Sequence, residues 1–256
     1  MKKIKSPKKK LNDEINIIVI NKIKIDKLKP LRKNFISRNN KLSATGYYKN
    51  IKVKVYGVHD KNQGKLRKFV SNHKDLSKYF PKLISFDDKF IVEEWVEGKT
   101  LKELKLNNSE FKTQSRKIKK IINIMWSVRY NHFVFDYIDF IHKRLKRKNY
   151  LDFTNVPNRI NHNDLSLDNI ILSSRGLKII DNEFLGCNNG WILNIKNSFL
   201  VEDFEYQNFV TKKTLNQLWN LRKEWGKLII ERNKKNNYFF KSIIKPLLKF
   251  INYFKI

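Results

Sequence analysis

One segment constrains the fold of this chain more than any other. From residue 161 it reads Asn-His-Asn-Asp-Leu-Ser-Leu-Asp-Asn-Ile-Ile-Leu, and after Gly176 it continues Leu-Lys-Ile-Ile-Asp-Asn-Glu. The two apolar runs on either side of the glycine turn predict a hairpin of short strands. Asp164 and Asn169 precede this hairpin and Asp181 follows it, so we expect the hairpin to return a second carboxylate beside the first. Carboxylate and amide oxygens are ligands that Mg²⁺ accepts in proteins.

The order His-x-Asp-x-x-x-x-Asn, apolar strand, Asp resembles the catalytic loop and metal-binding aspartate of the protein-kinase-like superfamily. Phosphoryl transfer needs a carboxylate that accepts the proton of the attacking hydroxyl, and oxygen ligands for Mg²⁺ on the ATP phosphates. The alternative is a polar hairpin in an Asn-rich chain, in which an asparagine falls at the right spacing by chance. Two further matches upstream, in the expected order, favour the catalytic interpretation.

These upstream matches are a strand and a hinge. In Val53-Lys54-Val55-Tyr56-Gly57 the lysine would reach the ATP phosphates, although Lys54 alone could equally be a solvated lysine among 55 basic residues. The stretch Ile91–Leu101 would be the hinge, where the backbone of Glu94 and Val96 pairs with adenine. The nucleotide loop would be Phe35–Asn40, with Arg38 as a source of positive charge.

Four stretches, residues 53–57, 81–101, 161–172 and 178–199, together resemble the choline/ethanolamine kinase family, and the resemblance covers about residues 35 to 200. That family carries a His-Asn-Asp-Leu loop, an Asp-x-Glu-aromatic element and an Ile-x-Asn-x-Phe element. Aminoglycoside phosphotransferases share the general pattern, usually with Gly between the His and the Asp. In this chain the three elements are His162–Leu165, Asp181–Phe184 and Ile195–Phe199.

The resemblance implies a two-lobe, protein-kinase-like α+β fold with a small β-rich N-lobe and a larger helical C-lobe. It implies that Asp164 is the catalytic base, that His162 orients the loop, and that Lys54 binds phosphate. Asn169 and Asp181 would be the Mg²⁺ ligands, and ATP the phosphate donor. The acceptor would be a small amino-alcohol, choline or ethanolamine.

A cationic amine is held in that family by carboxylates and aromatic faces. By the same resemblance Glu183 and Phe184 would lie near the acceptor, and Trp219 and Trp225 fall roughly where the family places pocket tryptophans. The alternative for the two tryptophans is the apolar face of an ordinary amphipathic helix, because Leu215 and Leu218 share their spacing.

Three departures leave other functions open. The loop Phe35–Asn40 has no glycine, the predicted helix over residues 63–78 offers only Asp75 as an acid to pair with the lysine, and Asn194 stands where the family has an aspartate. A nucleotide loop normally cradles phosphate with backbone N–H groups that glycines expose. A pseudokinase that acts as a binding module is therefore one alternative, and a kinase for aminoglycosides or other sugars is another.

The net charge is extreme, since 55 Lys and Arg against 24 Asp and Glu give +31. Such a charge suggests a nucleic-acid partner. A single alanine, Ala44, beside many Lys, Asn and Ile instead indicates an A/T-rich genome, and the basic residues are scattered. We therefore disfavour nucleic-acid binding. The single Cys187 excludes a disulfide within the chain and a thiolate-cluster metal site.

Along the chain we expect a disordered basic arm (1–12), an N-lobe with the nucleotide-binding sheet (13–97) and a helical C-lobe with the catalytic loop and the substrate pocket (98–256). Strands are predicted at 42–44 and 51–56, with turn residues at Thr45-Gly46 and Lys49-Asn50, and then at 82–86 and 90–96. In the strand at 51–56 the alternation puts Ile51, Val53 and Val55 on one face. Helices are predicted over 63–78 and from Thr100 to about Lys148. In the second helix the apolar residues with 3- and 4-residue spacing are Ile118, Ile121, Ile122, Met125 and Trp126.

No apolar run is long enough to cross a bilayer, so a cytoplasmic protein is expected. The stretch Tyr238–Ile251 puts Lys241, Lys245 and Lys249 on one helical face. It is a candidate for peripheral contact with anionic lipid at the inner membrane face. The alternative is a closing helix that packs on the C-lobe with its lysines in water.

Overall fold

The computed structural model describes residues 17–31, 43–147, 153, 155–195 and 211–234. Arg38 with its loop, the basic arm, the segment after Ile195 and the C-terminal basic stretch lie outside this part. The chain divides into two compact units. The first contains the residues up to Lys99 together with Ile171–Glu183, and the second contains Thr100–Ile170 and the residues from Phe184 onward.

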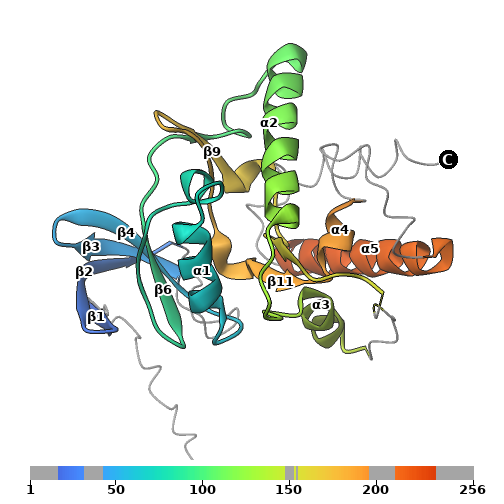
Figure 1. The fold of residues 1–256 in the computed structure, drawn as a ribbon, viewed down its shortest axis with the longest axis horizontal. Coiled ribbons are helices and arrows are strands. Elements are labelled where there is room, and N and C mark those ends of the chain that lie inside the picture. Colours follow the sequence, from blue (N-terminus) through green and yellow to red (C-terminus); the bar gives the residue numbers. More distant parts are fainter. Residues whose placement is uncertain (1–16, 32–42, 148–152, 154, 196–210, 235–256) are drawn as a thin grey trace, which may run out of the picture. The chain divides into compact units, whose positions relative to one another are not determined.

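The first unit is built on one antiparallel sheet of six strands, in the order β1-β2-β3-β4-β6-β5 (Figure 1). The buried core on this sheet includes Val53, Val55 and Val92. Helix α1 (Gln63–Asn72) packs against β5. The strands are β1 (Ile17–Ile20), β2 (Ile23–Pro30), β3 (Ser43–Tyr48), β4 (Ile51–Gly57), β5 (Leu83–Phe86) and β6 (Phe90–Glu94).

Two tight turns set the register of this sheet. Asn21-Lys22 joins β1 to β2 and Lys49-Asn50 joins β3 to β4, and all four residues have positive φ. Two consecutive residues with positive φ give the turn whose twist matches that of the flanking strands. The predicted turn at Lys49-Asn50 is confirmed. The turn role of Thr45-Gly46 is wrong, because both residues pair within β3.

The helix predicted over residues 63–78 is shorter than expected. It ends at Asn72 because His73 turns to an extended conformation, and a separate 3₁₀ turn, η1, covers Ser77–Tyr79. The first unit is completed by the hairpin of β9 (Ile170–Ser173) and β10 (Gly176–Ile179), in which Gly176 has φ of 91° at the turn. The predicted hairpin is confirmed.

The second unit is mostly helical. Helix α2 (Asn108–Ser127) begins with a capping box, in which the side chain of Asn107 accepts from the Glu110 N–H and the Glu110 side chain accepts from the Asn107 N–H. The apolar positions predicted from 3- and 4-residue spacing are buried. They are Ile118, Ile121, Ile122, Met125 and Trp126.

The expectation of one helix from Thr100 to Lys148 is wrong. After Ser127 the chain leaves the helix, bridges from Val134 to Cys187, and starts α3 (Tyr137–Leu145) with Asp136 as N-cap. The remaining described elements are β7 (Lys99–Thr100), β8 (Arg159–Asn161), η2 (Leu167–Asn169), η3 (Asn182–Phe184), β11 (Gly186–Asn188), α4 (Trp191–Ile195) and α5 (Lys212–Lys234).

The α+β class is confirmed, with strands dominating the first part of the chain and helices the later part. In the second unit β8 pairs antiparallel with β11, α2 packs against β8, and α3 and α4 pack against α5 (Figure 1). Among the described residues no helix is long and apolar enough to cross a membrane.

Candidate active site

Buried polar side chains gather at two places in the described part of the chain. One set lies in the second unit, at the end of β8, on the polar segment that follows it and on β11. The other set lies in the first unit around the turn after β10. Burying a polar group is unfavourable unless it is hydrogen-bonded, so such gatherings mark places where the fold maintains specific geometry. The sets are Asn161, His162, Asn163, Asn169 and Asn188 in the second unit, and Gln63, Arg67, Glu93 and Asn182 in the first.

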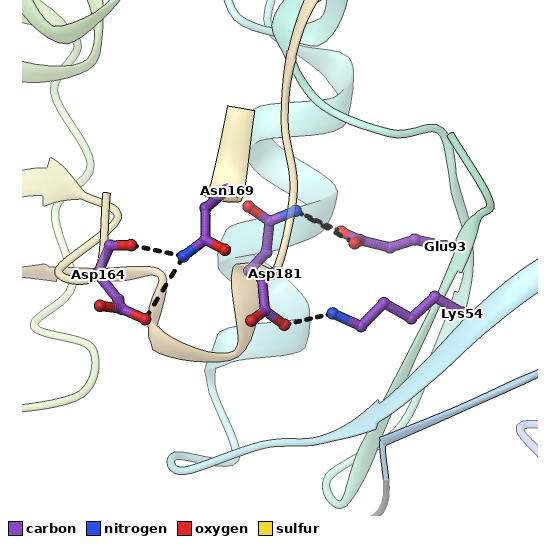
Figure 2. A network of polar contacts seen from close by, with 6 residues as sticks. Lys54, Glu93, Asp164, Asn169 and Asp181 are labelled. Carbon is purple, nitrogen blue, oxygen red and sulfur yellow. Dashed lines mark hydrogen bonds and ion pairs between the residues drawn. The ribbon is translucent and has the colours of Figure 1, made fainter. Parts of the chain in front are cut away.

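The loop that follows β8 carries Asp164 and Asn169. The Asn169 amide nitrogen donates to the Asp164 backbone oxygen at 2.7 Å and lies 3.4 Å from the Asp164 carboxylate oxygen Oδ2 (Figure 2). Because the amide nitrogen is engaged with Asp164, the oxygen Oδ1 is the atom of Asn169 that can bind a cation. His162 is fully buried, and its backbone oxygen accepts from the Asp164 N–H at 2.8 Å.

Asn163 fixes the shape of this loop. It is buried, has φ of 61°, and its side-chain amide donates to the Phe184 backbone oxygen at 2.8 Å. Its own oxygen accepts from the Asn161 amide at 2.6 Å. Positive φ at a non-glycine residue persists only where the surroundings hold it, and it is common at functional sites.

In the first unit Lys54 of β4 forms an ion pair with Asp181, which lies just after β10 (Figure 2). The side chains are 13% and 21% exposed, so the pair is largely shielded from water. Asp181 also has positive φ, 60°. The structure thus brings together two residues that the sequence analysis had assigned to phosphate and metal.

Three residues in contact with the turn after β10, or within it, were not predicted, and neither was the arginine that pairs with one of them. Glu93 accepts from the Asn182 amide at 3.1 Å and forms an ion pair with Arg67 of α1, and Gln63 donates to the Glu183 backbone oxygen at 3.0 Å. The sequence offered no local signal for them, since Glu93 neighbours Glu94 and Arg67 is one of 55 basic residues.

The predicted hinge residues, Glu94 and Val96, make few contacts that point to a role. The Glu94 N–H donates to the Lys82 oxygen at 2.9 Å, and the Glu94 side chain lies 4.0 Å from Arg175. Val96 lies beyond the end of β6, and no described residue accepts a hydrogen bond from its N–H. Adenine pairing at Glu94 and Val96 stays a prediction.

Phe184 belongs to an aromatic cluster in the second unit. Its ring lies 5.6 Å from that of Phe140, and the Trp225 ring lies 6.0 Å from Phe140, edge-on. We define the aromatic cluster as Phe135, Tyr137, Phe140, Phe184 and Trp225.

Trp219 does not join this cluster. It lies six residues before Trp225 on α5, so the two side chains point to different sides of the helix. Trp219 lines a small cavity between α4 and α5 with Leu193 and Leu215, and the Lys223 ammonium lies 5.3 Å from its ring centre. The structure therefore groups only one of the two predicted tryptophans with Phe184.

The aromatic cluster lies within the electrostatic reach of Asp164. Burial, and after it the Asp164 charge, raises the pKa of the Tyr137 phenol well above its usual range. Burial lowers the pKa of Arg222, while Tyr137 and Asp164 act in the opposite direction. Asp164, Tyr137 and Arg222 of the second unit therefore interact electrostatically.

The donor chemistry suits Mg²⁺ bound together with a nucleotide. Among the described residues no group of three or more His, Cys, Asp or Glu gathers to hold a metal ion by itself. Mg²⁺ in phosphoryl-transfer sites commonly takes one or two protein oxygens and completes its shell with phosphate and water. Asp181 in the first unit and the Asn169 oxygen in the second unit are each donors of that kind.

No protein-family model matches the sequence, and no curated protein does either. Solved structures with a similar fold include the following three. The first is choline kinase LicA from Streptococcus pneumoniae, with 18% sequence identity over 78% of this chain and 86% of that chain and a TM-score of 0.44. The second is ADP-bound aminoglycoside phosphotransferase APH(2″)-Ib, with 15% identity over 80% of this chain and 86% of that chain and a TM-score of 0.43. The third is the apo form of a thermostable mutant of aminoglycoside phosphotransferase APH(4)-Ia, with 10% identity over 85% of this chain and 81% of that chain and a TM-score of 0.46. At these TM-scores the similarity does not establish a family for this chain.

Proposed function

We propose that this protein is an ATP- and Mg²⁺-dependent kinase that transfers the γ-phosphoryl group to the hydroxyl of a small molecule. The observation that carries the proposal is the ion pair of Lys54 with Asp181. The lysine that the sequence motif singles out pairs with the aspartate at the end of the motif, 127 residues away. A strand lysine that served only as a solvated surface charge would not be expected to pair with this aspartate.

The residues have distinct chemical tasks in this proposal. The Asp164 carboxylate orients the acceptor hydroxyl and takes its proton as the oxygen attacks phosphorus. Lys54 offsets the negative charge of the ATP phosphates, and Asn169 and Asp181 would hold Mg²⁺. When bound, the metal neutralises charge on the phosphate oxygens.

We propose choline or ethanolamine as the acceptor. The support is the aromatic cluster, because aromatic faces attract quaternary and primary ammonium groups. Its Phe184 directly follows Glu183 in the chain, and its Tyr137 senses the Asp164 charge. Arg222 acts against a cationic acceptor, since it brings positive charge to the same surroundings. Aminoglycosides and other sugars are therefore tested in parallel.

The test is a product assay with ATP, with and without MgCl₂, over choline, ethanolamine, sugars and aminoglycosides. Asp164→Asn is expected to abolish turnover and to leave ATP affinity within about twofold, because it removes the base and not a phosphate contact. Asp168→Asn is the matched control, since Asp168 lies in the same loop, is half-exposed and pairs with Lys102.

The outcomes separate the alternatives. Turnover that depends on Mg²⁺ and on Asp164 supports the kinase. Wild-type turnover in Asp164→Asn rejects the assigned base. Thermal stabilisation by ATP without turnover of any acceptor identifies a pseudokinase that acts as a binding module.

A further inference from the structure

Glu93 lies next to Lys54 in the sheet of the first unit. The two residues are directly opposite each other in the antiparallel pairing of β4 with β6. Residues that face each other across an antiparallel pair project from the same side of the sheet. Their side chains meet consecutive residues of the turn after β10, since Lys54 binds Asp181 and Glu93 binds Asn182 (Figure 2).

The Glu93 carboxylate is almost completely buried, with 1% of the residue exposed. A buried charge needs a partner, and Arg67 of α1 provides it through Nε and Nη2. Burial lowers the pKa of Arg67, but the charges of Glu93 and Tyr56 and the hydrogen bonds to them together outweigh it, and the net shift is upward. Arg67 also donates to the Pro81 backbone oxygen at 3.2 Å, so the guanidinium is fixed in place.

The direction of the hydrogen bond between Asn182 and Glu93 is fixed by the charge of the acceptor. The Asn182 amide nitrogen lies 3.1 Å and 3.3 Å from the two Glu93 carboxylate oxygens. Turning the amide over would place oxygen against oxygen, which the negative charge of the carboxylate disfavours. Asn182 therefore donates, and the bond to an ionised acceptor belongs to the stronger class of hydrogen bonds.

A second hydrogen bond holds the turn from α1. The Gln63 amide nitrogen donates to the Glu183 backbone oxygen at 3.0 Å, while the Gln63 oxygen accepts from the Asp60 N–H at 3.0 Å. Three consecutive residues, 181 to 183, are thus held by side chains from β4, β6 and α1. Asp181 has positive φ, a conformation that needs such support.

We propose that Glu93, acting through Asn182, is a positioning residue that orients the Asp181 carboxylate for cation binding. This inference rests on the proposed function, in which Asp181 is a Mg²⁺ ligand. Arg67 forms an ion pair with Glu93 and so holds its carboxylate in place against the Asn182 amide. In this arrangement helix α1 contributes the arginine and strand β6 contributes the acid.

The experiment measures ATP binding by calorimetry on the full-length protein, without Mg²⁺ and over a MgCl₂ titration. Removing a residue that orients a metal ligand typically weakens metal binding by about 10–100-fold. Asn182→Ala is therefore expected to raise the half-saturating Mg²⁺ concentration by about 10-fold or more, with ATP affinity in the absence of Mg²⁺ unchanged within about twofold. A general loss of structure would weaken both. Asn123→Ala, at an exposed position of α2, is the matched control.

Asp181→Asn is the reference that separates this inference from the proposed function. If Asp181→Asn raises the half-saturating Mg²⁺ concentration and folded Asn182→Ala does not, Glu93 is not a positioning residue and the proposed function stands. If Asp181→Asn changes nothing, both are wrong. Should Asn182→Ala fail to fold, Glu93→Gln removes the charge of the acceptor in the same hydrogen bond and is judged by the same criterion.

Discussion

Lys54 and Asp181 form an ion pair across 127 residues of sequence, on a side of the sheet where Glu93 lies directly opposite Lys54. The positive Lys54 contacts the negative Asp181, and beside it the negative Glu93 accepts a hydrogen bond from the Asn182 amide. Each of these two side chains of the sheet is therefore paired with a group of opposite charge or polarity. Nucleotide phosphates entering near Lys54 would compete with Asp181 for its ammonium group, and a cation would compete with Lys54 for the Asp181 carboxylate.

Replacing the lysine tests its role with phosphate. Lys54→Met keeps the aliphatic stem and removes the charge, so we expect kcat/KM for ATP to fall by on the order of 100-fold, as for other single groups that stabilise transition-state charge. Steady-state kinetics at saturating acceptor measures the loss. Lys52→Met, two residues earlier on β4, removes a charge that pairs with Glu97 and should change kcat/KM by less than about twofold. Equal losses in the two variants would refute a specific role for Lys54.

The buried pair of Arg67 and Glu93 makes a separate prediction about stability. Arg67→Met leaves the Glu93 charge buried without its partner, which should lower the free energy of unfolding by about 3–5 kcal/mol. The double variant Arg67→Met/Glu93→Met should recover most of that loss, because two apolar side chains can replace a buried ion pair at little cost. Urea denaturation measures all three proteins.

The control for this cycle is an exposed ion pair. Lys102 lies 2.8 Å from Asp168, and both side chains are about half-exposed. Lys102→Met should change the free energy of unfolding by no more than about 1 kcal/mol. A double variant that is less stable than Arg67→Met alone would contradict the interpretation of the buried pair.

The elements that the sequence could predict are those with local signals. The alternation over residues 51–56 predicts one face for Ile51, Val53 and Val55, and the structure buries the two valines. The 3- and 4-residue spacing identifies the buried face of α2. The same spacing was extended too far beyond Ser127, because the following segment has no glycine or proline to mark the end of the helix. The association of residues 171–183 with the first unit depends on long-range packing, which has no local pattern.

The residues of the candidate site likewise include some that local sequence signals predict and some that they do not. Asp164, Asn169 and Asp181 follow from spacing within one segment of the chain. Glu93 and Arg67 do not, because adjacent strand residues point to opposite sides of a sheet and the sequence does not say which of Glu93 and Glu94 faces α1. Only the packing of α1 against the sheet makes that choice, and it buries the pair.

The aromatic cluster predicts a selective effect on the acceptor. Trp225→Leu removes an aromatic face, and loss of a cation–π contact of about 1.4 kcal/mol raises the KM for choline or ethanolamine about tenfold, with the KM for ATP unchanged. Initial rates with each substrate varied in turn measure the two constants. Phe133→Leu, at a residue 46% exposed, is the control. An unchanged acceptor KM in Trp225→Leu would exclude the cluster from acceptor binding.

The burial of His142 leads us to expect a loss of stability as the pH falls. His142 lies on α3 with 8% of the residue exposed, and neither ring nitrogen has a hydrogen-bond partner among the described residues. Burial lowers its pKa from the usual 6.5. The charged groups around it are Asp139, Arg147, Asp136 and Glu224, of which Arg147 acts with burial and the three acids act against it.

A histidine whose pKa is lowered in the folded state binds its proton more readily after unfolding. Its contribution to stability is therefore complete above pH 6.5 and is lost as the pH falls through the lowered folded value. We expect the melting temperature to fall between pH 7.5 and 5.5, and His142→Leu, which cannot be protonated, to fall less over the same range. His132→Leu, at an exposed position, should follow the wild type. Parallel curves for wild type and His142→Leu would show that His142 does not control this transition.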